Sequence, residues 1–517
     1  MSSVKDTMLN ATPQEDTILF LKRLAPTIIE THISMVFLDD NYAYKLKKAL
    51  TLPFVDFSQT EQRLACCHDE LRLNRRTAPD LYLEVMPIYR HSNGQLSFDD
   101  DGQSEVIDAV LKMRRFDSDT LFSKLAQKDQ LNSEMMTQLA HAIADFHEQA
   151  EISPDYQGAK RIRDIIELNK LSEPLVNKAL GHQRMTVLNL LLLKDIGYHA
   201  ALLNSRAANG KVRHCHGDLH LNNICLWQQT ATLFDCLEFN ESMATTDVLY
   251  DLAFVLMDLW HYKQHDHANW LMNRYMDQIN EADALVLLPL FMSLRASIRA
   301  MVIAIQANNS DNKTETKHCQ QQAEQFLDLA FDLLQRPKSQ LLAIGGLSGS
   351  GKSTLARALA PYFGAAPGAR VLSSDRIRKK LFGVALEDRL PPESYTEASS
   401  NLVYRTQREL SLAILQNGHS VIADAVFAKD LEREAIELCA QQANVPFNGL
   451  WLEAPPKELM NRVEARKNDP SDATVSVVKK QLKIAPGEIH WPRLNSAQAL
   501  DELLPQALTL LKGKWPW

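Results

Sequence analysis

The sequence has few of the features that mark secreted proteins. Only seven of its 517 residues are cysteine, their number is odd, and they form no CxxC pair. This pattern does not suggest a disulfide framework, and it predicts reduced, mostly buried thiols in a cytosolic protein. The cysteines are Cys66, Cys67, Cys215, Cys225, Cys236, Cys319 and Cys439.

Long apolar runs are also missing. The longest, residues 284–292, contains Pro289 and is much shorter than the roughly 20 residues that span a bilayer. The first residues, MSSVKD, lack the basic and then apolar pattern of a signal peptide. No internal repeat and no extended low-complexity segment occurs. We therefore expect a cytoplasmic protein without a membrane partner.

Charge of one sign is not in strong excess. The net charge is −8, from 56 Lys and Arg against 64 Asp and Glu. From Gln340 onward there are 22 basic against 19 acidic residues, a balance of +3, which leaves 34 against 45, or −11, for the preceding part. A mildly basic C-terminal part suits an anionic ligand such as a nucleotide. It is too weak to indicate duplex nucleic acid.

What the chain does have is length, and a change of pattern along it. At 517 residues it is too long for one core. After a short helix at 17–24, two β-like runs, 32–38 and 42–48, flank a polar turn; a helix follows over 59–76, and further strands are expected at 81–89 and 105–115. Helical periodicity then dominates residues 117–334, interrupted by a β-rich patch at 212–239. A strand-rich lobe before a helix-rich lobe is the order of protein-kinase-like folds.

A second pattern begins after residues 336–339, a short linker that contains Pro337. Strands are expected at 341–344, 370–373, 421–423 and 447–452, with helices between them, which predicts a parallel sheet covered on both faces. The predicted fold class is therefore multidomain. A two-lobed, kinase-like α+β domain occupies residues 1–335, with its N-lobe at about 15–115 and its C-lobe at about 116–335, and an α/β domain occupies residues 340–517.

The first candidate site reads HGDLHLNN at residues 216–223 and is followed by Asp235 at the end of a short apolar strand. A kinase needs a carboxylate to orient the acceptor hydroxyl and oxygen ligands for the metal on the phosphates. Asp218 and Asn223 supply both, at the interval found in protein-kinase catalytic loops. The phosphate-clamping lysine belongs on an early strand, with a glutamate on the next helix; Lys45 and Glu70 fit these places. Lys47 faces the same way as Lys45, so the choice of lysine stays open.

Together these residues resemble the aminoglycoside phosphotransferase branch of the kinase-like superfamily, which also covers choline, homoserine and fructosamine kinases. The resemblance covers roughly residues 15–335. It implies that Asp218 is the catalytic base, that Asn223 and Asp235 bind magnesium, and that Lys45 and Glu70 form the ion pair beside the nucleotide. Two features depart from protein kinases: no Gly-rich loop precedes the lysine, and CLE at 236–238 replaces Phe-Gly. We expect His220 and Asn222 to make local hydrogen bonds, and Asp247 and Asp251 to brace the catalytic loop.

The second candidate site reads GLSGSGKS at residues 346–353, between an expected strand and an expected helix. The glycines let backbone N–H groups face phosphate oxygens, and the helix N-terminus adds its dipole. Lys352 brings positive charge to the β- and γ-phosphates, and Ser353 is expected to ligate magnesium. The predicted nucleotide-binding set is Gly346, Ser348, Gly349, Ser350, Gly351, Lys352, Ser353 and Thr354.

Residues beyond this loop suggest how phosphoryl transfer would proceed there. Asp375, just after the second strand, is placed to take the proton of an acceptor hydroxyl, with Arg378 one helical turn on. Asp424 ends the next strand and can join the metal shell through water; it is also the alternative base. Arg462 and Arg466 share one helix face and could close over the phosphoryl group as a lid.

Residues 340–517 resemble the P-loop class of small-molecule and polynucleotide kinases, including gluconate-type, zeta-toxin-type and phage polynucleotide kinases. The pairing of the two halves resembles bacterial two-domain proteins that join an aminoglycoside-phosphotransferase-like domain to a P-loop kinase domain. The resemblance implies ATP and Mg²⁺ as cofactors and gives no substrate and no oligomeric state.

Three hypotheses about function follow. We favour a bifunctional kinase that transfers the γ-phosphoryl group of ATP to hydroxyls of small molecules. The second is one active P-loop kinase with a non-catalytic, ligand-binding kinase-like domain. The third is a nucleic-acid 5′-hydroxyl kinase, which is not favoured; it predicts a basic, aromatic groove near Asp375. The residues that would line such a groove are Arg376, Arg378, Lys379, Lys380 and Phe382.

Overall fold

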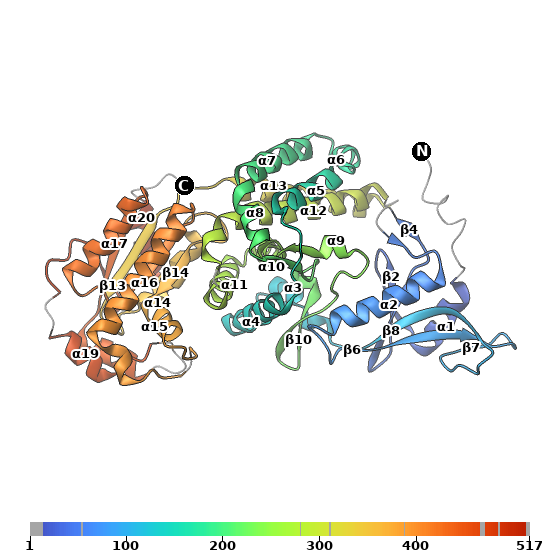
Figure 1. Cartoon of the computed structure of the whole chain (residues 1–517), viewed down its shortest axis with the longest axis horizontal. Coiled ribbons are helices and arrows are strands. Elements are labelled where there is room, and N and C mark those ends of the chain that lie inside the picture. Colours follow the sequence, from blue (N-terminus) through green and yellow to red (C-terminus); the bar gives the residue numbers. More distant parts are fainter. Residues whose placement is uncertain are drawn as a thin grey trace. The chain divides into compact units, whose positions relative to one another are not determined.

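A computed structural model describes residues 14–52, 55–279, 281–309, 312–386, 388–465, 471–483 and 486–512 (Figure 1). The chain forms two compact units. The first contains Met1–Asp164 and Ala200–Asp258, and the second contains Ile165–His199 and Leu259–Trp517. The predicted linker at 336–339 lies inside the second unit, between α13 (Lys313–Leu334) and β13 (Leu341–Gly346). The domain boundary at this linker therefore stays a prediction.

The first unit is built on a six-stranded sheet of order β1-β2-β3-β8-β6-β7. The predicted hairpin is confirmed, because β2 (Ser34–Leu38) pairs antiparallel with β3 (Tyr42–Lys47). The next helix, α2 (Thr60–Asn74), packs on β6 (Tyr82–Arg90) and β8 (Glu105–Arg114), as Figure 1 shows. The other elements of this part are α1 (Glu15–Leu24), β1 (Thr27–Glu30), β4 (Thr51–Leu52), β5 (Val55–Asp56) and β7 (Leu96–Ser97).

The rest of the first unit is mainly helical, with short strands around the HGD motif. In the predicted β-rich patch, β9 (Val212–His214) pairs with β12 (Thr245–Asp247), and β10 (Ile224–Trp227) pairs with β11 (Thr230–Leu233). The catalytic-loop residues lie between β9 and β10 and begin after buried Cys215. The helices are α3 (Phe122–Gln127), α4 (Ser133–Gln149), α5 (Gly158–Lys170), α8 (Ala200–Ala208), α9 (Glu241–Ala244) and α10 (Val248–His261), of which α5 and α10 run on into the second unit.

One part of the second unit is a group of helices packed around a long apolar helix. This is α12 (Leu288–Asn309), which packs on α13, α6 (Glu173–Leu180) and α7 (Arg184–Tyr198). By length and composition, residues Asp283–Asn309 would suffice to cross a membrane, with a mean hydropathy of 1.7. However, 72% of that window is buried inside the fold, which is how the core helix of a helical bundle is placed. Helix α11 (His265–Gln278) precedes this bundle in the chain.

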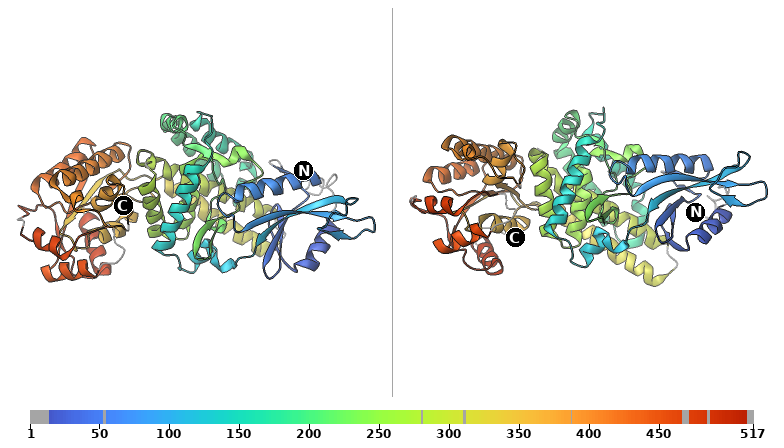
Figure 2. Two further views of the ribbon diagram at one scale, coloured as in Figure 1. Left: turned by 60° about the horizontal axis from the view of Figure 1, so that its bottom comes forward. Right: turned by 90° about the horizontal axis from the view of Figure 1, so that it is seen from below.

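Residues after 340 form the predicted parallel sheet, of order β14-β15-β13-β16-β17. All four expected strands occur: β13, β14 (Arg370–Ser373), β15 (Val421–Asp424) and β16 (Phe447–Glu453), with a short fifth strand, β17 (Arg493–Asn495). Helices flank the sheet on both sides (Figure 2). On one face, α14 (Lys352–Leu359) and α20 (Leu500–Lys512) share an apolar core with β13, β16 and β17. The other helices are α15 (Ser374–Leu381), α16 (Glu397–Gln416), α17 (Asp430–Gln442), α18 (Pro456–Glu464) and α19 (Val475–Gln481).

Candidate active sites

Lys45 on β3 and Glu70 on α2 form the ion pair that the sequence predicts. Nζ of Lys45 lies 2.6 Å from Oε1 of Glu70 and 2.5 Å from Oδ1 of Asp235. Burial lowers the pKa of Lys45, but the charges of Asp235 and Glu70 outweigh this effect and hold the pKa well above its ordinary value. The lysine is therefore held in its charged form beside Asp235.

The other candidate lysine, Lys47, has different ion-pair partners. Its Nζ lies 2.6 Å from Oε2 of Glu70, and it pairs with Glu238, while its side chain has no solvent exposure. Burial lowers the pKa of Lys47, and the charges of Glu238 and Glu70 raise it far above its usual range. Glu238 belongs to the CLE segment that replaces Phe-Gly, so this departure from the kinase pattern supplies the counter-ion of a buried lysine. The geometry favours Lys45 as the lysine that meets phosphates.

Asp235 sits at a turn with an unusual backbone. Its φ is 63°, in the left-handed region that aspartate tolerates better than most residues. Its N–H donates to the hydroxyl oxygen of Tyr82 at 3.0 Å, which fixes the turn against β6. Burial raises the pKa of Asp235, but the charge and hydrogen bond of Lys45 outweigh it, so the pKa lies below its ordinary value. An ionised carboxylate is the form that binds Mg²⁺.

Asp218 and Asn223 lie together in the loop that follows β9. Nδ2 of Asn223 donates to the backbone oxygen of Asp218 at 2.9 Å and to its Oδ2 at 3.1 Å. Because the amide nitrogen is committed to Asp218, the amide oxygen is the end left to face a cation. The Asp218 side chain is 41% exposed, and its charge acts on Asp235. His220 lies 3.3 Å from Oδ2 of Asp218, which agrees with the local role expected for it.

Buried carboxylates hold this loop by its backbone. Asp251 accepts from the N–H groups of His216 at 3.1 Å and Gly217 at 3.0 Å, which confirms the expected bracing contact. Asp258, which the sequence analysis did not single out, accepts from Leu221 N–H at 3.0 Å. Gly217 has φ 83°, and a Cβ there would lie 3.0 Å from Cβ of Leu237 and 3.1 Å from the backbone of Ala244, so glycine is required.

Asp247, the other expected brace, contacts elements next to the catalytic loop and not the loop backbone itself. It forms a two-pronged ion pair with Arg206, at 2.7 and 2.8 Å, and caps the start of α10 at Leu249 N–H. A third buried group, His147, contacts Oδ2 of Asp251 at 3.1 Å. The ligand atoms of His147, Cys215 and Asp251 lie within 4.8 Å of one another. Both oxygens of Asp251 accept from backbone N–H groups, so its geometry is that of a brace.

The P-loop connects β13 to α14 as the motif predicts. Gly351 precedes the first turn of α14 with φ 85°, and Nζ of Lys352 donates to the backbone oxygen of Leu347 at 3.1 Å. Gly349 has φ 87°, and a Cβ there would lie 2.5 Å from the backbone oxygen of Leu459, so the loop needs glycine at this close approach. Ser353 and Thr354 lie in the exposed first turn of the helix. A phosphate at this position would meet the helix N-terminus and the lysine charge.

Ser348 and Ser350 depart from the simple picture of a phosphate cradle. The N–H of Ser348 donates to Oε1 of Gln481 at 2.9 Å, and Nε2 of Gln481 donates to Oγ of Ser348 at 3.1 Å. Within the described part of the chain, Oγ of Ser350 is buried without a hydrogen-bond partner. The roles predicted for both serines stay predictions.

Asp424 ends β15 and is 2% exposed. Burial raises its pKa, against the lowering charge of Lys352 and the hydrogen bond of Ser353. Among the described residues, its Oδ2 has no hydrogen-bond partner. A buried carboxylate oxygen without a donor beside Lys352 and Ser353 has the chemistry of a ligand for a hydrated cation. These residues therefore fit Mg²⁺.

Asp375 lies in the first turn of α15 and lines a small cavity together with Asp424 and Ser353. Arg378, predicted as its catalytic companion, is 7% exposed and donates to the backbone oxygen of Ser394 at 2.6 Å. Its guanidinium lies over the ring of Tyr395, 4.9 Å from the centroid. These contacts connect α15 to the segment before α16, and the catalytic role of Arg378 stays a prediction.

The basic groove that a nucleic-acid kinase would need near Asp375 does not form in the described residues. Lys379 is fully buried and donates to the backbone oxygens of Leu386 and Asp388, at 2.6 and 2.7 Å. Arg376 and Lys380 both bind Asp277 on α11. Phe382, the aromatic of this segment, is 37% exposed. Most of the basic side chains of α15 therefore make contacts within the protein.

The lid predicted on α18 is partly described. Arg462 donates to Oε1 of Glu458 at 2.9 Å, and a Cβ on Gly351 would lie 3.9 Å from its Nη1. Arg462 therefore lies next to the P-loop, as a lid residue should. Arg466 lies outside the described residues.

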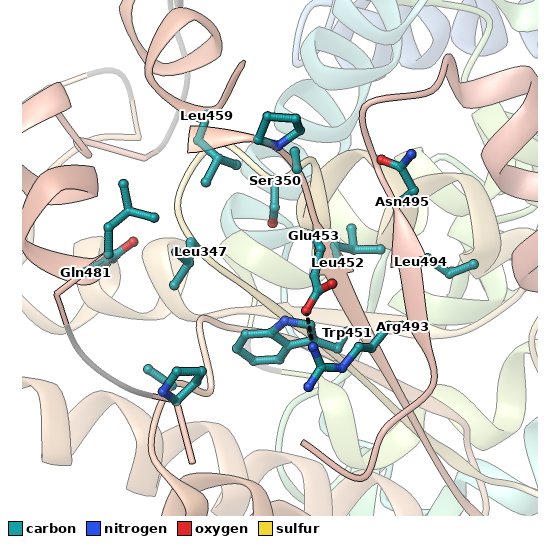
Figure 3. A pocket seen from close by; sticks show the side chains of 15 residues that line it. Leu347, Ser350, Trp451, Leu452, Glu453, Leu459, Gln481, Arg493, Leu494 and Asn495 are labelled. Atoms are coloured by element: carbon teal, nitrogen blue, oxygen red, sulfur yellow. Dashed lines mark hydrogen bonds and ion pairs between the residues drawn. The ribbon is translucent and has the colours of Figure 1, made fainter. Parts of the chain in front are cut away.

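A cavity of about 670 Å³ opens on the other side of the P-loop (Figure 3). Leu347 and Ser350 of the P-loop, Trp451 of β16 and Leu459 of α18 contribute to its wall. In its wall, Arg493 of β17 pairs with Glu453 of the adjacent β16 at 2.7 Å, which Figure 3 marks with a dashed line. An aromatic and aliphatic wall beside a phosphate-binding loop has the size and character of a small-molecule site. The sequence analysis missed this cavity, because its residues come from five separate segments.

Comparison with known proteins agrees with the two sites. Residues 55–273 match the family model described as "Phosphotransferase enzyme family", and residues 341–486 match the model described as "AAA domain". An uncharacterized protein of Mycobacterium tuberculosis is 27% identical over 493 residues, 92% of this chain and 94% of its own length. The adenylyl-sulfate kinase of Myxococcus xanthus is 31% identical over 125 residues, 24% of this chain and 62% of that protein.

Solved structures resemble each half separately. An aminoglycoside 2′-phosphotransferase mutant in complex with GDP is 12% identical with a TM-score of 0.39, covering 62% of this chain and 100% of its own. A gluconokinase from Sinorhizobium meliloti is 22% identical with a TM-score of 0.25, covering 34% of this chain and 92% of its own. The two family matches agree with the predicted order of a phosphotransferase domain followed by a P-loop domain, and the chain is an ATP-dependent kinase.

Proposed function

We propose that this protein is a bifunctional kinase in the cytoplasm that transfers the γ-phosphoryl group of ATP to hydroxyl groups of small molecules at two separate sites. The observation that carries the proposal is that each site has the full set of residue types for phosphoryl transfer. Lys45, Asp218 and Asp235 serve the first, and Lys352, Asp375 and Asp424 serve the second. Neither set borrows a residue from the other.

At the first site, Lys45 neutralises phosphate charge and is held for that purpose by Glu70. Asn223 and Asp235 would hold Mg²⁺, which would supply positive charge against the negative charge that develops during phosphoryl transfer. Asp218, exposed at the mouth of its loop, accepts the proton of the acceptor hydroxyl.

At the second site, backbone N–H groups of the P-loop and Lys352 hold the β- and γ-phosphates. Ser353 and Asp424 would hold Mg²⁺, Asp424 through water. Asp375 orients the acceptor hydroxyl and takes its proton, while Arg462 closes over the transferring group. The large cavity beside Leu347 and Trp451 suits the base and ribose of the nucleotide.

The experiment is an ATP-turnover screen of a library of hydroxyl metabolites, run on the full chain and on Lys45→Ala and Lys352→Ala. Each substitution removes the phosphate-binding charge of one site, so we expect some acceptors to be lost in one variant and others in the second. If every acceptor depends on Lys352 and none on Lys45, the kinase-like half is a non-catalytic binding domain. If no acceptor of any class is phosphorylated, the proposal is wrong.

A further inference from the structure

The small cavity at Asp375 is lined by arginine as well as by acidic residues. It has a volume of about 40 Å³ and lies at the carboxyl ends of β14 and β15. Three guanidinium side chains contribute to its wall: Arg357 from α14, Arg376 from α15 and Arg274 from α11. Arg274 is the unexpected one, because α11 precedes the P-loop in the sequence by about seventy residues and follows the kinase motifs of the first half.

Helix α11 is fixed against β14 by buried amide side chains. Oδ1 of Asn273 accepts from Val371 N–H at 2.8 Å and from Nη1 of Arg370 at 3.0 Å. One turn earlier, Nδ2 of Asn269 donates to the backbone oxygens of Pro367 and Ala369, at 3.0 and 3.1 Å. Both asparagines are 3% exposed. These bonds set the position of α11 along the sheet edge and thereby place the adjacent Arg274 at the cavity.

The arginines outnumber their counter-charges. Asp277 forms the ion pairs of Arg274 at 3.2 Å, Arg370 at 2.7 Å and Arg376 at 2.8 Å. The cavity wall adds two carboxylates, Asp375 and Asp424, so four arginines meet three carboxylates here. Arg274 and Arg357 also lie over the ring of Trp270, 5.0 and 5.1 Å from its centroid. Such stacking supports a guanidinium without neutralising it.

Arg274 itself is poorly compensated. Its side chain is 5% exposed, and in the described part of the chain its Nε has no hydrogen-bond partner. Burial lowers its pKa to about 10, with Asp277 opposing and Arg370 and Arg357 adding to the effect, so it stays protonated at neutral pH. A buried cation with a free donor gains from an anion that supplies both charge and hydrogen-bond acceptors.

We infer that Arg274 is an acceptor-binding residue of the P-loop site, and that the acceptor carries an oxyanion, such as a phosphate, sulfate or carboxylate, near its reacting hydroxyl. This inference rests on the kinase function proposed for the P-loop site. The cavity has about three times the roughly 10–15 Å³ that one water needs, which is room for such a group. Asp375 would then hold the hydroxyl of the same molecule.

The oxyanion belongs to the acceptor and not to the nucleotide, because the two cavities of this site have no lining residue in common. The larger one meets the P-loop at Leu347 and Ser350, and the smaller one meets the loop at Ser353. A nucleotide that runs from the larger cavity along Lys352 would end its phosphates at Ser353. The smaller cavity lies beyond that point, where an in-line acceptor must approach.

The test measures binding of radiolabelled inorganic phosphate to the full chain by equilibrium dialysis. The P-loop is first saturated with Mg²⁺ and a non-hydrolysable ATP analogue, so that phosphate cannot bind there. We expect one phosphate bound at the second unit in the parent protein and at least tenfold weaker binding in Arg274→Gln. Arg405→Gln is the matched control: it removes the same charge from a side chain on α16 that is 63% exposed, and should change binding less than twofold.

Two further variants keep the test decisive if Arg274→Gln is poorly folded. Arg376→Gln should also weaken phosphate binding, and Arg274→Lys, which keeps the charge, should lose less than Arg274→Gln. Thermal unfolding and analogue binding are recorded for every variant. If the parent binds the analogue but no phosphate, or if phosphate binds equally to folded Arg274→Gln, the inference is wrong while the kinase proposal stands. If the parent does not bind the analogue, the kinase proposal for this site fails first.

Discussion

The two sites differ in how their charges are balanced. In the kinase-like site, two lysines and three carboxylates form a closed set of ion pairs. Lys45 pairs with Glu70 and Asp235. Lys47 pairs with Glu70 and Glu238. In the P-loop site, Oδ2 of Asp424 and Nε of Arg274 are buried without partners among the described residues. The first site pairs its buried ions with one another at close range, whereas the second, in the described part of the chain, leaves two buried polar atoms without a hydrogen bond for its ligands to meet.

This difference has an energetic consequence. A closed network of buried ions is preorganised, and Asp235, with a side chain that is 37% exposed, is its member that can meet a metal. A site with unsatisfied buried polar atoms costs free energy in the folded protein, and ligands that hydrogen-bond to those atoms recover it. Ligands should therefore stabilise the P-loop domain more than the kinase-like domain.

The largest expected effect comes from removing the acceptor-orienting carboxylate of each site. Asp218→Asn and Asp375→Asn should each lower phosphoryl transfer at their own site by roughly 10²–10⁴-fold, the usual contribution of a positioned base. ATP affinity should stay nearly unchanged, because the nucleotide is held by other residues. Acceptors specific to each site, found in the turnover screen, separate the two effects. Full activity of Asp375→Asn would instead make Asp424 the candidate base.

The second effect distinguishes the two lysines of the kinase-like site. Lys47→Met leaves Glu238, which is 5% exposed, as a buried charge without its partner, so it should lower the free energy of unfolding of this domain by about 3–5 kcal/mol. Lys45→Met leaves Asp235 at 37% exposure and should cost less than half as much, while abolishing nucleotide binding there. Urea unfolding and calorimetry, both in a Lys352→Ala background, measure the two quantities. The reverse pattern would assign the phosphate contact to Lys47.

The ambiguity between these lysines shows what the sequence can and cannot predict. The hairpin, α2 and the strand–loop–helix of the P-loop follow from local periodicity and turn residues, and all are confirmed. Residues two apart on a strand face the same way, so the pattern cannot choose between Lys45 and Lys47. The choice depends on Asp235 and Glu238, about 190 residues away, whose positions only the folded chain determines.

The same limit explains the other differences. Arg378 is predicted as a catalytic residue from its spacing to Asp375, and this role stays a prediction. The contact of its Nη1 with the backbone oxygen of Ser394 is one that no local pattern indicates. Arg274 carries no motif at all. A signal was present in the two asparagines and the arginine of α11, since polar residues that become buried need specific partners. Which partners they meet is a property of the tertiary structure.

The third effect is a loss of stability at low pH, when a buried histidine outside the site would have to become charged. His419 is 2% exposed, its Nε2 lies 3.1 Å from the backbone oxygen of Gly368, and burial lowers its pKa to about 4. A depressed pKa means that the stabilisation is complete above the unfolded-state pKa near 6.5 and is lost as the pH falls toward 4. The loss should reach roughly 3 kcal/mol, at 1.36 kcal/mol for each pH unit. His419→Gln keeps an N–H donor and should remove most of this pH dependence; an unchanged acid transition would show that His419 does not cause it.

The smallest effect concerns the stability of the P-loop part of the chain when it is produced as a separate fragment. We predict that residues 340–517 fold alone, because the sheet and both covering layers lie within them. Without α11, the fragment loses the hydrogen bonds that Asn273 makes with β14 and Asn269 makes with the segment before β14. Solvent replaces these bonds, and the free energy of unfolding should fall by about 2 kcal/mol. The fragment should bind a Mg²⁺-loaded ATP analogue as the full chain does, because its P-loop is intact, but it should lose phosphate binding because Arg274 is absent. Circular dichroism and equilibrium dialysis on the fragment measure both. A fragment that is unfolded while the full chain is sound would place the boundary before α11 and make the two halves one cooperative structure.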